Sequence, residues 1–162
     1  PDECRALVLR CCGSTRFARH MEESRPFLSQ AALMGMAEEN WWRLAPKDYL
    51  EAFTHHPQIG ASRDELEKKF PKTKDISGAE QAQVAAASGD ILDRLAQKNK
   101  EYLEKFGFIF IICATGKSAE EMLQRLEERL PNDPEQEIYI AAGEQAKITR
   151  LRLEQLTTEN LS

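Results

Sequence analysis

The amino-acid sequence predicts an all-α fold, in which a single helical-bundle domain contains one extended, buried connector. Two observations support this prediction. Apolar residues recur at intervals of three and four over most of the chain, which is the spacing of residues on one face of a helix. Only one stretch, FIFIICA at residues 108–114, has the composition of a β-strand, and a lone strand has no partner with which to form a sheet.

The size and charge of the chain narrow the classes of function. With 162 residues, the chain can form one domain with a real hydrophobic core, and we expect that domain to cover residues 1–162. No apolar run approaches the roughly 20 residues that cross a bilayer, so we expect no membrane partner. The net charge of −5 argues against a nucleic-acid partner, because phosphate binding needs a basic surface.

In the first half of the chain, local signals mark where the predicted helices begin and end. Serine and threonine cap a helix start, proline fits a first turn, and glycine ends a helix. These rules predict helices over residues 4–12, 14–24, 30–45 and 46–53, with boundaries at Gly13, Ser14 or Thr15, Pro26, Ser29 and Pro46.

In the second half, residues 60–76 are strongly charged and predict a surface excursion with a short helix at residues 63–70. Ser77 then opens the longest periodic segment, which Gly107 ends after Phe106. Its predicted apolar face consists of Ile91, Leu92, Leu95, Tyr102, Leu103 and Phe106. Ser118 and Glu121 predict a capping box, and Asp133 opens a final helix that reaches about residue 156.

The four cysteines do not form a recognisable metal or disulfide pattern. Cys4, Cys11, Cys12 and Cys113 lack CxxC spacing, and the adjacent pair is poorly placed for a disulfide framework. We expect reduced thiols in an intracellular compartment, mostly buried as small apolar residues, rather than zinc ligands.

The stretch AFTHHPQIG holds two of the three histidines of the chain. Because Pro57 follows His56, the backbone of His56 is restricted to extended geometry, which helps to aim an imidazole. The ordinary pKa of histidine, about 6.5, suits proton transfer near neutrality. The alternative is a histidine at a helix end that contacts a free carbonyl. His55 and His56 are expected to point in different directions, which disfavours a metal site made from the pair.

Three further stretches have both a structural and a functional interpretation. Ser77 and Glu80 have the spacing of a capping box, which leaves Gln81 unexplained. The backbone of residues 107–114 needs hydrogen-bond partners, which could be neighbouring side chains, water or a planar amide-rich ligand.

The third stretch is the last helix, where steps of three and four residues place Arg152 on an apolar stripe. A buried arginine needs an anionic partner, which could be Glu80 or a substrate carboxylate. The predicted stripe consists of Ile138, Ala141, Gln145, Ile148, Arg152 and Leu156.

In chain order, the motifs are His56-Pro57 with Gly60, Ser77-x-x-Glu80-Gln81, Phe106-Gly107-Phe108 with Cys113-Ala114, and Lys147-Ile148 with Leu151-Arg152-Leu153. Together they resemble the 2-oxo-4-hydroxy-4-carboxy-5-ureidoimidazoline (OHCU) decarboxylase family, over nearly the whole chain. The resemblance implies an all-helical homodimer that needs no metal or organic cofactor. It also implies the last step of urate breakdown, in which OHCU loses CO2 and yields (S)-allantoin.

The resemblance further implies which residues form the site. His56 and Glu80 would be catalytic. The substrate would be bound by Pro57, Ser77, Gln81, Phe108, Ile111, Ile112, Cys113 and Arg152, with the backbone of residues 111–113 contacting its ring. Residues 63–74 are the part of the chain least similar to the family.

The details CCGSTRFARHM and KFGFIFIICATG are most similar to plant members, in which the decarboxylase is fused to a transthyretin-like 5-hydroxyisourate hydrolase. We therefore expect an isolated decarboxylase domain of a longer protein from the peroxisome or cytosol. Two other functions remain to be tested. One is a non-enzymatic helical interaction module, and the other is a metal-dependent ureide hydrolase that uses His20, His55, His56 and a carboxylate.

Overall fold

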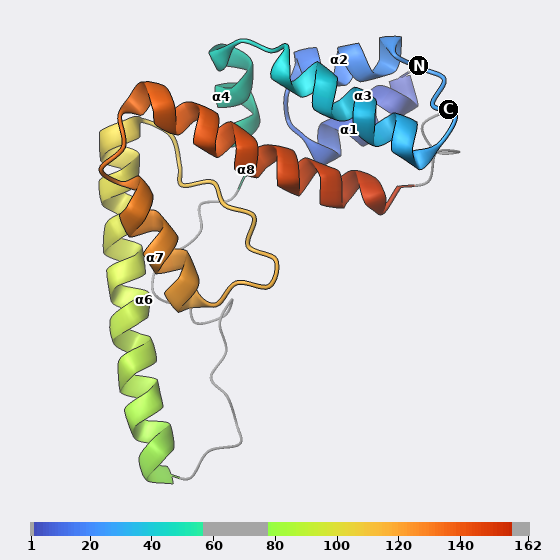
Figure 1. The fold of residues 1–162 in the computed structure, drawn as a ribbon. Coiled ribbons are helices and arrows are strands. Elements are labelled where there is room, and N and C mark those ends of the chain that lie inside the picture. Colours follow the sequence, from blue (N-terminus) through green and yellow to red (C-terminus); the bar gives the residue numbers. More distant parts are fainter. Residues whose placement is uncertain (1, 57–77, 157–162) are drawn as a thin grey trace. The chain divides into compact units, whose positions relative to one another are not determined.

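The computed structural model describes residues 2–56 and 78–156, with side chains from residue 89 onward in the second range (Figure 1). Within these ranges it contains seven helices and no strand, which confirms the predicted all-α class. No helix in the described part of the chain is both long enough and apolar enough to span a bilayer. The predictions for Pro57, Gly60, the segment 63–74 and Ser77 lie outside the described residues.

The described residues form two compact units. The first contains residues 2–56 and 138–156, and the second contains residues 78–137. The expectation of a single domain over the whole chain remains a prediction.

The first unit consists of α1 (Asp2–Cys11), α2 (Thr15–Glu23), α3 (Gln30–Trp42), α4 (Pro46–Thr54) and most of α8 (Pro134–Glu154). Helix α2 packs against α1, α3 and α4 (Figure 1). The predicted starts are confirmed: the Ser14 hydroxyl accepts from Phe17 N at 3.2 Å, and the Ser29 hydroxyl accepts from Ala32 N at 3.0 Å. Ser14, rather than Thr15, is therefore the cap of α2.

Aromatic side chains fill the core of the first unit. The Trp41 indole packs edge-on against Phe17, with ring centroids 5.8 Å apart, and its N–H donates to the Ala142 carbonyl at 3.0 Å. The Tyr49 hydroxyl donates to the Trp41 carbonyl at 3.1 Å. The indole N–H and the phenol hydroxyl are therefore both hydrogen-bonded, and the two rings connect α8 to α3 and α4 without an unpaired buried donor.

The buried stripe of α8 differs from the predicted one. Its fully or nearly fully buried side chains are Ala141, Ala142, Gln145, Thr149 and Leu153. Ile138, Ile148 and Arg152 are only half-buried, so Arg152 lies at the edge of the stripe and not in its middle. The prediction was wrong because steps of three and four residues both fit the pattern, and the core follows the four-residue steps from Ala141.

The second unit consists of α6 (Gly78–Phe106), α7 (Ala119–Arg129), the segment between them and the first residues of α8. Gly107 ends α6 with a left-handed φ of 78°, and its N–H donates to the Leu103 carbonyl at 2.9 Å. The buried face of α6 includes Leu92, Leu95 and Tyr102, as predicted. Leu103 is 36% exposed and was wrongly placed on that face, because it follows Tyr102 by one residue, about 100° around the helix.

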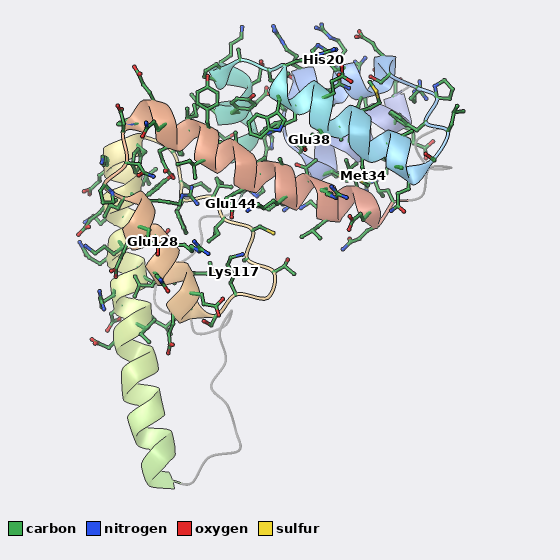
Figure 2. All side chains as sticks on the ribbon, viewed as in Figure 1. His20, Met34, Glu38, Lys117, Glu128 and Glu144 are labelled. Atoms are coloured by element: carbon green, nitrogen blue, oxygen red, sulfur yellow. The ribbon has the colours of Figure 1, made fainter. Side chains whose placement is uncertain are left out.

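The segment 108–113 forms neither a helix nor a strand and is mostly buried, as expected for the predicted connector. Two cations hold its backbone: Arg129 Nη1 donates to the Ile111 carbonyl at 2.7 Å, and Lys117 Nζ donates to the Cys113 carbonyl at 2.9 Å. Figure 2 shows Lys117 on the loop that follows this segment. Side chains of the same unit therefore satisfy two of the carbonyl groups that an isolated strand leaves without partners.

Arg129 belongs to a buried polar group, the Arg129 cluster, which consists of Arg129, Glu137, Tyr102 and Asn132. Arg129 Nε lies 2.6 Å from Glu137 Oε1, and the Tyr102 hydroxyl donates to the same oxygen at 2.6 Å. Asn132 donates to the other carboxylate oxygen at 2.9 Å. The Glu137 side chain has no solvent exposure, so these bonds replace its hydration.

Candidate functional site

His56 lies just beyond the C-terminal end of α4. Its N–H donates to the Phe53 carbonyl at 3.2 Å, and the preceding residue, His55, is the C-cap of the helix. His55 is exposed and lies against Gly13, whereas His56 is half-buried and contacts Gln145. The two imidazoles therefore point toward different partners, as predicted.

The close approach of His55 depends on Gly13, in the turn between α1 and α2. A Cβ atom at position 13 would overlap the ring of His55 and would lie 2.7 Å from its Cβ. Only glycine fits this contact without movement of the histidine backbone, so Gly13 sets how closely the turn approaches the end of α4.

A hydrogen-bonded thread runs from His56 into the core of the first unit. We call it the His56 thread, and it consists of His56, Gln145, Thr149 and Cys12. His56 Nε2 contacts Gln145 Oε1, and Gln145 Nε2 donates to Thr149 Oγ1 at 3.0 Å. The Thr149 hydroxyl in turn bonds the Cys12 thiol. The other three residues of the thread are buried.

Arg152 contacts the C-terminal end of α1. Its Nη1 donates to the Cys11 carbonyl at 3.2 Å, which is a favourable position for a cation because carbonyl groups are unsatisfied at that end of a helix. This partner is neither of the two that the sequence suggested. The side chain of Glu80 lies outside the described residues, and the substrate carboxylate remains a hypothesis.

The environment of His56 favours a neutral imidazole. Burial is the main cause that lowers its pKa below the usual value, and the nearby charges of Arg152 and His55 lower it further. The hydrogen bond that His56 donates to the Gln145 carbonyl acts in the opposite direction and raises the pKa. At neutral pH, His56 can therefore accept a proton. Burial also raises the pKa of Cys12 to about 11, so this thiol stays protonated and is a poor nucleophile.

The structure brings His56 and Arg152 together in the first unit and places the other described residues of the predicted site in the second. Phe108, Ile111, Ile112 and Cys113 are all buried in the segment 108–113. Phe108 packs against the rings of Tyr102 and Phe106, at centroid distances of 5.8 and 5.9 Å. Glu80 and Gln81 lie in the first turn of α6, but their side chains, like Pro57 and Ser77, lie outside the described residues.

Gln145, Thr149 and Cys12 were not recognised as site residues in the sequence. One signal was present: Gln145 and Thr149 are polar residues four apart on an otherwise apolar stripe of α8. Buried polar groups in such positions need partners, but the sequence does not name them.

The third histidine, His20, lies in the last turn of α2 (Figure 2). No group of three or more His, Cys, Asp or Glu side chains that could hold a metal ion is found over residues 2–56 and 89–156.

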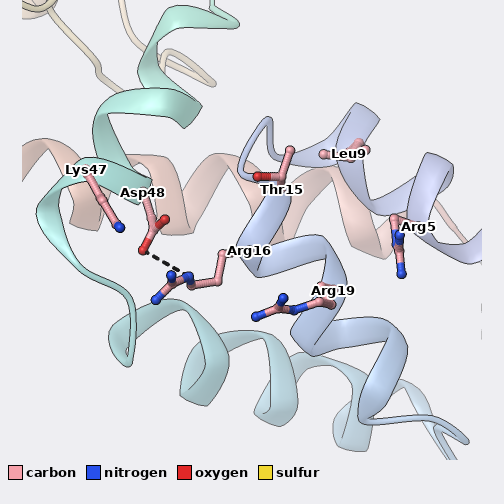
Figure 3. Close-up of a pocket in the computed structure, with 7 residues that line it drawn as sticks. All are labelled: Arg5, Leu9, Thr15, Arg16, Arg19, Lys47 and Asp48. Carbon is pink, nitrogen blue, oxygen red and sulfur yellow. Dashed lines mark ion pairs between the residues drawn. The ribbon is translucent and has the colours of Figure 1, made fainter.

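A basic cavity of about 410 Å³ lies elsewhere in the first unit, between α1, α2 and α4 (Figure 3). Its lining consists of Arg5, Leu9, Thr15, Arg16, Arg19, Lys47 and Asp48. Each arginine has a carboxylate partner: Arg5 pairs with Glu22, Arg16 with Asp48 at 3.8 Å, and Arg19 with Glu23 at 3.8 Å. The cavity is therefore a solvated surface of ion pairs, and none of the predicted site residues lines it.

Known proteins resemble the chain in sequence and in fold. The Arabidopsis thaliana uric acid degradation bifunctional protein TTL is 43% identical over 150 residues, which are 92% of this chain and 46% of that protein. The OHCU decarboxylase of Amia calva is 42% identical over 103 residues, or 62% of this chain and 57% of that protein. The chain thus spans about half the length of these curated relatives.

Two solved structures share the fold. A crystal structure of OHCU decarboxylase in the presence of (S)-allantoin matches with a TM-score of 0.72 and 40% identity, covering 91% of this chain and 94% of that one. A crystal structure of (S)-allantoin synthase matches with a TM-score of 0.67 at 18% identity, which shows a common fold alone. The model of the OHCU decarboxylase family matches residues 1–154, a range that holds all of the predicted site residues and both units of the fold. The chain belongs to the OHCU decarboxylase family.

Proposed function

We propose that this protein removes CO2 from OHCU and yields (S)-allantoin, the last step of urate breakdown. The observation that carries the proposal is the family match over residues 1–154. Two of the similar proteins support the substrate: one is named for uric acid degradation, and the other was solved in the presence of (S)-allantoin.

The chemistry of the substrate explains what the protein must supply. One ring carbon of OHCU carries a carboxylate and a hydroxyl and lies next to a C=N bond. When the bond to the carboxylate breaks, its electron pair moves toward this C=N bond, and CO2 leaves. The hydroxyl loses its proton to become the carbonyl of allantoin, while the neighbouring carbon and the nitrogen of the former C=N bond each gain one, so the reaction takes up one proton in all. The ring itself accepts the electrons, so the protein contributes orientation, charge placement and proton transfer.

Two described residues suit these tasks. His56 is held neutral by burial and neighbouring positive charge, so it can take the hydroxyl proton. The guanidinium of Arg152 has several N–H donors, and its bond to the Cys11 carbonyl uses one of them. Another would donate to an anionic or carbonyl oxygen of the substrate. Glu80 would orient the reacting groups, and Ser77, Gln81, Pro57, Phe108 and the backbone of residues 111–113 would bind the ring and the ureido group.

Circular dichroism during turnover tests the proposed activity. Urate oxidase and 5-hydroxyisourate hydrolase would produce the unstable substrate in the cuvette, with and without the protein. We expect a rapid (S)-allantoin signal that depends on protein concentration. A signal that only matches slow, racemic spontaneous decay would reject the activity and favour an interaction module.

A chelator arm distinguishes a metal-dependent hydrolase from the proposed decarboxylase. We expect the rate to be unchanged after treatment with EDTA. Loss of activity that zinc restores would instead support the metal-dependent alternative.

We also propose that the protein forms a homodimer through a patch on the first unit. Trp42 and Tyr139 are 43% and 51% exposed, and both pack against the ring of Tyr49, at 6.2 and 6.1 Å. Adjacent exposed aromatic side chains are typical of interface centres. Sedimentation velocity should give a dimer for the wild type and a monomer for Tyr139→Glu, and a monomeric wild type would reject the proposal.

The bifunctional relatives support the proposal that this domain belongs to a longer, two-function protein. A transthyretin-like 5-hydroxyisourate hydrolase would be fused to this domain, and the product of the hydrolase would be converted further by the decarboxylase. We propose a peroxisomal or cytosolic location, which imaging of the tagged full-length protein would test.

A further inference from the structure

The orientation of the Gln145 amide determines which nitrogen of His56 carries a hydrogen. An amide carbonyl oxygen only accepts hydrogen bonds and an amide NH2 group only donates them. Because Gln145 Oε1 contacts His56 Nε2, that nitrogen must be protonated. A neutral imidazole carries one N–H, so the lone pair then lies on Nδ1.

The rest of the His56 thread holds the Gln145 amide in this orientation. Gln145 is fully buried, and its NH2 group donates to Thr149 Oγ1 at 3.0 Å. Thr149 thus accepts from Gln145 and uses its own hydrogen for the Cys12 sulfur, which also accepts from the backbone N–H of Ser14. Reversing the amide would require the Thr149 hydroxyl to donate to Gln145 and the Cys12 thiol, a weak donor, to donate to Thr149. The observed orientation therefore uses the stronger donors.

We propose that Gln145 is a positioning residue that holds His56 as the Nε2–H tautomer and aims Nδ1 at the proton of the substrate. This inference rests on the proposed decarboxylation. As CO2 leaves, the hydroxyl proton of the substrate moves to Nδ1, and the ring becomes an imidazolium. The Nε2–H group stays hydrogen-bonded to Gln145 throughout, and transfer of the proton from Nδ1 back to the substrate or to water returns His56 to the neutral state.

The charged groups around His56 predict how changes at Gln145 affect its protonation. Arg152 on α8 and the adjacent His55 both oppose the imidazolium, whereas the Gln145 carbonyl supports an N–H group. The thiols of Cys11, the last residue of α1, and Cys12, directly after it, stay protonated because burial raises the pKa of both. Gln145→Met removes the acceptor and should lower the pKa of His56, while Gln145→Glu adds a negative charge and should raise it.

The first measurement needs no substrate. In the ¹⁵N NMR spectrum of the protein above the pKa of His56, we expect Nε2 to show the shift of an N–H nitrogen and Nδ1 the shift of an unprotonated one. The titration midpoint should move down in Gln145→Met and up in Gln145→Glu. An Nδ1–H tautomer in the wild type, or the same midpoint in all three proteins, would overturn the proposal.

The second measurement is the dependence of kcat and kcat/KM on pH. Gln145→Met should lower kcat roughly 10–100-fold with little change in KM. The acidic limb of the kcat/KM profile, which reports the free enzyme, should follow the NMR midpoint. Gln136→Met, at an exposed position of α8, is the matched control and should behave as the wild type. A wild-type pH profile in Gln145→Met would contradict the positioning role.

A second variant covers the case in which Gln145→Met does not fold. Thr149→Val keeps Gln145 but removes the hydroxyl that accepts from its amide. This variant should give a mixture of both His56 tautomers. A pure Nε2–H spectrum in this variant would overturn the role of the thread. If the wild type shows no decarboxylation, the proposed function fails, but the NMR result still decides the tautomer.

Discussion

At the scale of single residues, Arg152 shows how one side chain can serve both the fold and the site. One arm of its guanidinium bonds the end of α1, and its charge helps to keep His56 neutral. An ammonium group cannot make a two-pronged contact while it also holds the Cys11 carbonyl. A substrate oxygen would therefore bind less well to lysine at this position.

We predict that Arg152→Lys raises KM or lowers kcat by roughly 10–100-fold, the equivalent of about 1.5–3 kcal/mol for a hydrogen bond to a charged group. Steady-state kinetics would measure this change. Arg150→Lys is the control, because Arg150 is exposed and pairs with Glu154 at 3.3 Å. Equal kinetics for the two variants would remove Arg152 from the proposed site.

At the scale of the elements, the Arg129 cluster joins α6, α7 and the start of α8 to the segment 108–113. Arg129→Met would leave the carboxylate of Glu137 buried without its cation, although Tyr102 and Asn132 still donate to it. We predict a loss of about 3–5 kcal/mol in the free energy of unfolding, measured with urea. Arg125→Met, at an exposed pair on α7, should change it by less than about 1 kcal/mol. A small loss for Arg129→Met would show that the cluster adds little to stability.

The turn between α1 and α2 gives a second prediction at this scale. Gly13→Ala forces the ring and backbone of His55 to move, and we expect it to cost about 1–3 kcal/mol of stability. Gly35→Ala is the matched control, since nothing lies within 4 Å of a Cβ at that position of α3. There, alanine should stabilise the helix by about 0.5–1 kcal/mol. Thermal unfolding of both variants tests the contrast, and equal effects would contradict the described contact.

At the scale of the whole molecule, the sequence predicted the helices well because their boundaries depend on local chemistry. Ser14, Ser29 and Ser118 each accept a hydrogen bond from a backbone N–H three residues later, and Gly107 adopts the backbone geometry that ends a helix. A single residue and its neighbours in the sequence determine such features. The segment 108–113 was also predictable, because its composition fits no helix.

Long-range partners could not be predicted in the same way. Gln145 contacts His56 across 89 positions of the chain, and Arg152 contacts Cys11 across 141. Periodicity showed that both lie on or near the buried face of α8, but not what lies opposite. The assignments of His56 and Arg152 came from the resemblance to a family, and physical reasoning alone left each with a structural alternative.

We propose that His56, and not His55, transfers the proton in decarboxylation. The most direct test compares initial rates of (S)-allantoin formation for the wild type, His56→Asn and His55→Asn, with folding verified by circular dichroism. We predict that His56→Asn folds and loses at least about 100-fold in rate, and that His55→Asn stays within a few-fold of the wild type. A folded His56→Asn protein with wild-type activity, or a larger loss in His55→Asn, would show that His56 does not transfer the proton.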